Sequence, residues 1–134
     1  MSDFRIIVTG GRTRSSAQDY IQLLDAFTRE TDARYPGMRQ LPVTIVQGGC
    51  PDGMDDWARV LAEECACKCE TFLADWKKHG RAAGPIRNQA MADAGADLCL
   101  AFPSAGRSLG TWDMIRRACA AGIETRIYPE AAHE

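Results

Sequence analysis

An apolar stretch, Val43–Val46, passes through Gly48–Gly49 into a segment with helical periodicity that begins at Gly53. This order of strand, glycine turn and helix is typical of the βα units of an open parallel sheet. Similar turns occur at Gly10–Gly11 and at Gly106–Thr111. In such sheets the turns after the strands share one edge, where backbone N–H groups and helix dipoles attract phosphate. We therefore predict a binding site for a phosphorylated, nucleotide-type small molecule.

Apolar runs that are continuous rather than alternating predict strands covered on both faces. The expected strands are Phe4–Thr9, Val43–Gln47, Lys68–Ala74, Asp97–Phe102 and Glu124–Tyr128. Helical periodicity fills the gaps between them, so we expect a single α/β domain over residues 1–134, with three layers, a Rossmann-like arrangement and a parallel five-stranded sheet. By analogy with other doubly wound folds, we expect the strand order 3-2-1-4-5.

Capping residues predict where the helices begin and end. Ser15 or Ser16 is expected to cap the first helix, and Pro85 is expected to open the third. Thr111 is expected to cap the fourth helix, which should end before Gly122.

The composition limits the classes of function. The formal net charge of −2 and the pI near 5.7 argue against a general nucleic-acid surface, which needs a basic face. We find no apolar run long enough for a membrane span or a signal peptide, so we expect a cytoplasmic protein. The six cysteines lack the spacing of a zinc site, and we expect reduced structural thiols, no metal and no cofactor.

The first glycine turn matches neither the Gly-Lys-Ser/Thr loop nor the Gly-x-Gly-x-x-Gly fingerprint, which disfavours ATP hydrolysis and dinucleotide redox chemistry. It offers backbone N–H groups, hydroxyls and two guanidinium groups, a set suited to phosphate. Arg12 is the preferred ligand over Arg14, because it is nearer the end of the strand. The alternative is a plain turn with solvated arginines.

A basic stretch from Ala74 to Met91 follows the third strand. Asp75 could accept ribose hydroxyls there, and Trp76 could stack on a base or simply anchor the loop. Arg87 and Asn88 are expected in the first turn of a helix, where they could reach a phosphate or the ribose. A solvated helix face is the alternative for both.

Five separated motifs resemble the YspA-related (cpYpsA-related) branch of the SLOG superfamily of small Rossmann-like domains. They are Thr9–Arg12, Gln47–Asp55, Ala74–Trp76, Gly80–Asn88, and Phe102-Pro103 followed by Gly110-Thr111. The superfamily includes the LOG phosphoribohydrolases, the DNA-processing protein DprA and sensor domains for ADP-ribose-type signals. The resemblance implies a nucleotide-derived ligand and a homodimer.

The LOG enzymes hydrolyse the N-glycosidic bond of nucleoside 5′-monophosphates with an arginine and a glutamate, the latter in Pro-Gly-Gly-x-Gly-Thr-x-x-Glu. Arg87 resembles the arginine, but Met114 occupies the position expected for the glutamate. Asp113 is the nearest acid and Asp75 is a second substitute, so Arg87 and Asp113 are the catalytic candidates that the resemblance implies. Stabilisation of the helix dipole is the other interpretation of Asp113.

Two functions remain open. The preferred one is binding, by which the protein would sense or sequester ADP-ribose, a cyclic ADP-ribose relative or a nucleoside monophosphate. The alternative is a LOG-like phosphoribohydrolase. The expected ligand-binding residues are Gly10, Gly11, Arg12, Gly48, Gly49, Asp75, Trp76, Arg87, Asn88, Gly110 and Thr111.

Overall fold

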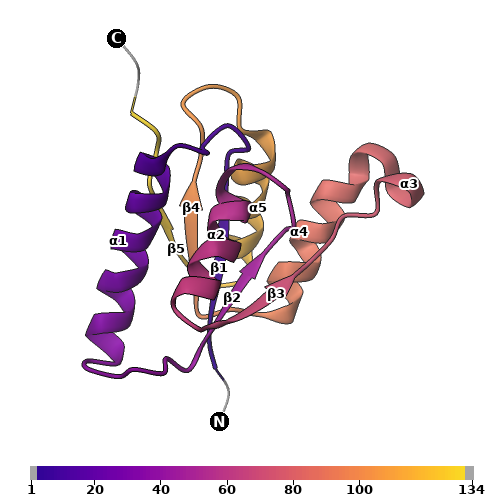
Figure 1. The fold of residues 1–134 in the computed structure, drawn as a ribbon. Coiled ribbons are helices and arrows are strands. Elements are labelled where there is room, and N and C mark those ends of the chain that lie inside the picture. Colours follow the sequence, from indigo (N-terminus) through magenta and orange to yellow (C-terminus); the bar gives the residue numbers. More distant parts are fainter. Residues whose placement is uncertain (1–2, 132–134) are drawn as a thin grey trace.

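The computed structural model describes residues 3–131 and contains one parallel sheet in the order β3-β2-β1-β4-β5 (Figure 1). The strands are β1 (Phe4–Gly10), β2 (Val43–Gln47), β3 (Lys68–Thr71), β4 (Leu98–Phe102) and β5 (Glu124–Ile127). The helices are α1 (Ala17–Arg34), α2 (Gly53–Glu64), α3 (Trp76–His79), α4 (Ala83–Ala94) and α5 (Leu109–Ala120), with a 3-10 turn, η1 (Gly80–Ala82), between α3 and α4. The predicted Rossmann-like architecture and strand order are confirmed.

Helices α1 and α2 cover one face of the sheet, and α4 and α5 cover the other (Figure 1). On the first face, Phe27 of α1 and Met54 of α2 are buried against the sheet. On the second face, Met91 of α4 and Met114 of α5 are buried. This double cover explains why the inner strands β1, β2 and β4 have continuous apolar runs. No helix in the described part of the chain is both long and apolar enough to cross a membrane.

Two of the predicted helix starts are wrong. Helix α4 begins at Ala83, two residues before Pro85, because the N–H groups of a first turn have no partner within the helix and proline fits anywhere in that turn. Helix α5 begins after Ser108 as N-cap, so Thr111 lies inside its first turn. The side-chain oxygens of Ser108 and Thr111 lie 3.1 Å apart.

All six cysteines are free thiols, but they differ in burial. Burial raises the pKa of Cys99 in β4 to about 12 and that of Cys67 to about 11, which keeps both protonated and inert. Cys69 and Cys119 are exposed, so the expected structural role fits only the more buried thiols.

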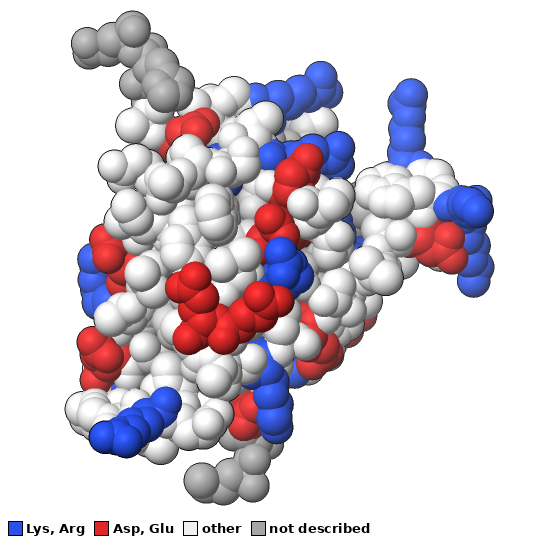
Figure 2. Space-filling model, viewed as in Figure 1, with Lys and Arg blue, Asp and Glu red and all other residues white. Residues whose placement is uncertain are grey.

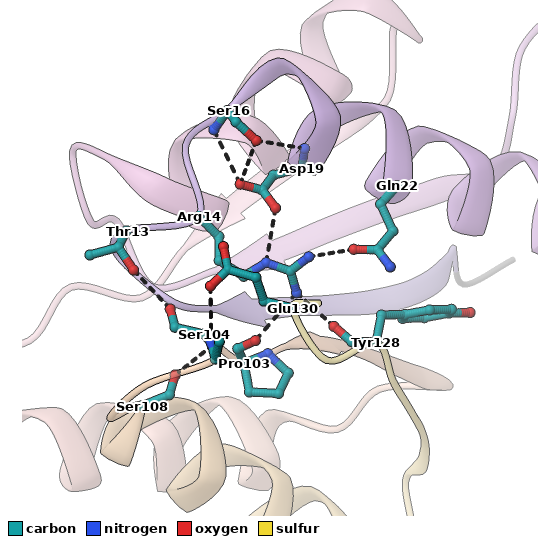
Figure 3. A network of polar contacts seen from close by, with 11 residues as sticks. Thr13, Arg14, Ser16, Asp19, Gln22, Pro103, Ser104, Ser108, Tyr128 and Glu130 are labelled. Atoms are coloured by element: carbon teal, nitrogen blue, oxygen red, sulfur yellow. Dashed lines mark hydrogen bonds and ion pairs between the residues drawn. The ribbon is translucent and has the colours of Figure 1, made fainter. Parts of the chain in front are cut away.

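A buried guanidinium, that of Arg14, anchors the loop between β1 and α1 (Figure 3). Its Nε donates to the carboxylate of Asp19 at 2.9 Å. Its other nitrogens donate to the side-chain carbonyl of Gln22 and to the backbone carbonyls of Pro103 and Tyr128, the latter at 2.6 Å. The loop is thereby fastened to α1, to the end of β4 and to the segment that follows β5.

The segment after β5 also holds the loop between β4 and α5 (Figure 3). The N–H of Glu130 donates to the carbonyl of Pro103 at 3.2 Å, and the N–H of Ala105 donates to the Glu130 carboxylate at 3.0 Å. The hydroxyls of Thr13 and Ser104 lie 3.0 Å apart and join the two loops directly. Three segments that are distant in sequence thus form one connected edge of the molecule.

We expect Asp19→Ala to lower the free energy of unfolding by about 3–5 kcal/mol, because it leaves the Arg14 guanidinium buried without its carboxylate. Urea unfolding followed by circular dichroism measures the change. Asp25→Ala removes an exposed carboxylate from the same helix and should change stability by less than about 0.5 kcal/mol. Equal effects of the two substitutions would contradict the anchoring role of Arg14.

Candidate functional site

A cavity of about 240 Å³ opens at the carboxyl edge of the sheet, where β1 ends. The chain runs outward from β1 to β2 and β3 and then returns to β4 on the other side of β1, so the strand order reverses here. Open α/β sheets bind their ligands at this point. The walls come from the loops after β1, β2 and β4, and from residues of α2, α4 and α5.

The loop after β1 lines the cavity largely with backbone. A Cβ atom at Gly10 would stand 2.8 Å from the carbonyl oxygen of Phe102, so only glycine permits this close approach. Gly11 follows it along the cavity wall. The structure brings the exposed Arg12 to the cavity and keeps Arg14 in its buried ion pair, away from it.

Arg87, in the second turn of α4, reaches the loop after β2. Its Nη1 donates to the carbonyl of Gly48 at 2.6 Å, and its Nε donates to Oδ1 of Asn88 at 3.0 Å. A Cβ atom at Gly48 would collide with the guanidinium, so this glycine makes room for it. Gly49 does not line the cavity; its φ of +79° requires a left-handed backbone, and it lies against the side chain of Leu73.

Asn88 is buried, and the bond that its Oδ1 accepts from Arg87 holds the guanidinium in place. Its Nδ2 donates to the carbonyl of Gly110 at 3.2 Å and to the carboxylate of Asp113 at 3.0 Å. Burial raises the pKa of Asp113, but hydrogen bonds from Arg117 and Asn88 outweigh it, so the pKa lies below its ordinary value. Asp113 is not among the cavity-lining residues. Its carboxylate is held ionised, and it orients Asn88.

The loop after β4 and the first turn of α5 complete the cavity. The hydroxyl of the N-cap Ser108 accepts the N–H of Ser104 at 3.2 Å and makes no capping bond to the helix. The N–H groups at the start of α5, near Gly110 and Thr111, therefore have no side-chain cap, and such groups attract anions. Arg107 adds another guanidinium to the lining.

Asp55, the third residue of α2, is the one acidic side chain among the described residues that line the cavity. Its Oδ2 accepts the N–H of Cys50 at 3.1 Å. Burial raises the pKa of Asp55 above its ordinary value, although the Cys50 N–H and the charge of Arg87 act against this. The sequence analysis missed Asp55 as a site residue, although the glycine motif ends on it, and it also missed Arg107.

The structure does not bring Asp75 or Trp76 to the cavity. Both lie at the start of α3, which projects from the body of the molecule (Figure 1). Asp75 accepts the N–H of Lys78 at 3.1 Å as a helix cap, and Trp76 is 55% exposed, with its ring close to Gly84. Basic side chains, Lys77 and Lys78 among them, gather on this projection (Figure 2).

Residues 4–79, more than half of the chain, match the YspA, cpYpsA-related SLOG family. The chain belongs to this family. Over 123 residues it is 38% identical to the Gene 61 protein of Mycobacterium phage D29, and the aligned part covers 89% of this chain and 91% of that protein. No solved structure matches it.

Membership in the SLOG family implies a ligand derived from a nucleotide. The matched residues include the loops after β1 and β2 and the whole of α2, and therefore Arg12, Gly48 and Asp55. Arg87 and the start of α5 lie beyond the match, so their place in the cavity rests on the geometry of this SLOG protein alone.

We expect Asp55→Asn to raise the melting temperature at neutral pH. The pKa of Asp55 is raised in the folded protein, so its ionised form costs stability above that pKa, and this cost disappears as the pH falls below about 3.9, the ordinary value for aspartate. The gain from the substitution should therefore shrink on acidification. Thermal melting across this pH range measures it.

The matched control for this prediction is Asp56→Asn, which removes the same charge from the neighbouring, partly exposed residue that pairs with Arg59. It should give no such gain. A melting temperature of Asp55→Asn at or below that of the unaltered protein at neutral pH would contradict the prediction.

Proposed function

We propose that this protein binds a nucleotide-derived small molecule, and thereby senses or sequesters it, with a phosphate of the ligand held in the cavity. The main support is that three arginines, Arg12, Arg87 and Arg107, line one small cavity together with glycine backbone and the uncapped start of α5. Guanidinium groups donate to phosphate oxygens in pairs, and helix N-termini favour negative charge.

ADP-ribose, a cyclic ADP-ribose relative and a nucleoside monophosphate are the candidate ligands. Each carries a phosphate on the 5′-carbon of a ribose. The cavity of about 240 Å³ is smaller than the roughly 300–1,000 Å³ that is usual for small-molecule sites. We therefore infer that it takes up a phosphate and the adjoining sugar, while the rest of the ligand extends over the open side.

A LOG-like N-glycosidase is the alternative function. Against it, Met114 stands where the LOG glutamate is expected and is fully buried in the core, and Asp113 lies outside the cavity. In its favour, the cavity contains Asp55, and a carboxyl group with a raised pKa is suited to proton transfer. Binding without turnover explains more features of the site, namely the three arginines, the glycine backbone and the uncapped start of α5.

To test the proposal, the purified protein is mixed with AMP, ADP-ribose, NAD or cyclic ADP-ribose, and the melting temperature is recorded. A ligand present at 100 times its Kd stabilises by about 2.7 kcal/mol, which is a shift of several degrees. Arg87→Met should weaken that ligand about 10- to 100-fold, because it removes charged hydrogen bonds. Arg59→Met, on the exposed side of α2, should leave the affinity unchanged.

The same samples are analysed by chromatography for released base. A stabilising ligand recovered intact supports binding, and Asp113→Asn should keep its affinity, because asparagine can still accept from Asn88. Released base that disappears with Asp55→Asn or Asp113→Asn would favour the N-glycosidase. Neither a shift nor released base with any of the four compounds would mean that the ligand class is wrong.

We also propose that the protein forms a homodimer through the start of α5. Leu109 is 64% exposed and Trp112 is 41% exposed, and large exposed apolar side chains are typical of interfaces. Light scattering during gel filtration should give the mass of a dimer. Leu109→Lys should shift the protein to the mass of a monomer, and a monomeric unaltered protein would contradict the proposal.

A further inference from the structure

The carboxylate of Asp55 is negative when ionised, as is the phosphate that we propose for the same cavity. Asp55 shares the cavity with Arg12, Arg87 and Arg107. A phosphate monoester is mostly a dianion at neutral pH and offers only acceptor oxygens. A carboxylate facing it would repel it and could form no hydrogen bond with it. Asp55 therefore contacts a part of the ligand other than the phosphate, one that carries hydrogen-bond donors.

Holding the loop after β2 does not require a carboxylate. Asp55 accepts the N–H groups of Cys50 and Gly48, which keeps that loop close to α2. The neutral side-chain oxygen of an asparagine has two lone pairs and could accept both bonds without the cost of burying a charge. The start of α2 and the charges of Arg87 and Arg12 offset part of this cost, but burial still outweighs them, so the fold gains little from the charge and a ligand that donates to Asp55 would explain it better.

The carboxylate keeps free acceptor capacity on the cavity side. Carboxylate oxygens offer about four acceptor positions, and within residues 3–131 the groups that bond to it are the backbone N–H groups of Cys50 and Gly48. The charges of Arg87 and Arg12 both act on Asp55, so it lies next to the cations that would hold the phosphate. A donor in contact with Asp55 is therefore close to the phosphate within the same ligand.

We propose that Asp55 binds the 2′- and 3′-hydroxyls of the ligand's ribose, so that the cavity selects 5′-phosphorylated ribosides over their deoxy counterparts. This inference rests on the proposed nucleotide-binding function and specifies which part of the nucleotide the cavity recognises in addition to the phosphate. Hydroxyls on the sugar are the donors nearest to a 5′-phosphate. Hydrogen bonds to a charged acceptor are strong enough to discriminate between the two sugars.

The test is calorimetric titration of the protein with AMP and with 2′,3′-dideoxyadenosine 5′-monophosphate, in EDTA so that no divalent cation bridges carboxylate and phosphate. We expect the unaltered protein to prefer AMP by about 10- to 100-fold. Asp55→Asn should reduce this preference to within about threefold, by weakening AMP while leaving the dideoxy compound as tight or tighter. The melting temperature of the variant verifies that it is folded.

Asp56→Asn is the matched control, because it removes the same charge from the adjacent residue on the outer side of α2. It should keep the full preference for AMP. Equal affinity of the unaltered protein for the two compounds, or a preference that survives in Asp55→Asn, would overturn the role of Asp55 and leave the proposed function standing. If neither compound nor ADP-ribose binds, the proposed function itself fails.

Discussion

Gly53 approaches the loop after β1 so closely that a Cβ atom there would stand 2.5 Å from the carbonyl oxygen of Gly11. The N–H of Met54 donates to that same oxygen at 3.4 Å, and the φ of +70° at Gly53 lies in the left-handed region that favours glycine. The two strand-to-helix connections after β1 and β2 thus meet backbone to backbone, and the side chain of Met54 packs close to Gly10. The start of α2, and with it Asp55, takes its position from this contact.

Around this contact, the polar side chains fall into two groups with different tasks. Asp113 and Arg14 face protein atoms and hold other groups in place, and Asn88 does the same although it also lines the cavity. Arg12 and Asp55 face the cavity. Because the holding contacts are complete without a ligand, little ordering remains to be done on binding, and such preorganisation reduces the entropic cost of association.

The strands of the sheet could be predicted from the sequence, because continuous apolar runs indicate burial and glycine turns indicate where strands end. Asp75 was placed beside the ligand because β3 was predicted to continue to Ala74, whereas it ends at Thr71 and the chain then leads into the projecting α3. Asp55 was missed because helical periodicity distinguishes core from surface, and a residue that faces a cavity belongs to neither class. Arg87 was predicted from its place near a helix start, but its bond to the loop after β2 depends on long-range packing that no local pattern reports.

The last described residues connect the C-terminal end of the chain mechanically to the ligand edge of the sheet. Glu130 is bonded to both ends of the Pro103–Ala105 turn, whereas β1 starts at the opposite edge of the sheet (Figure 1). The two bonds of Glu130 lie on either side of Ser104, which lines the cavity. Tension on the chain at Glu130 would therefore act first on the β4–α5 loop, whereas tension at Phe4 would act a full strand length away.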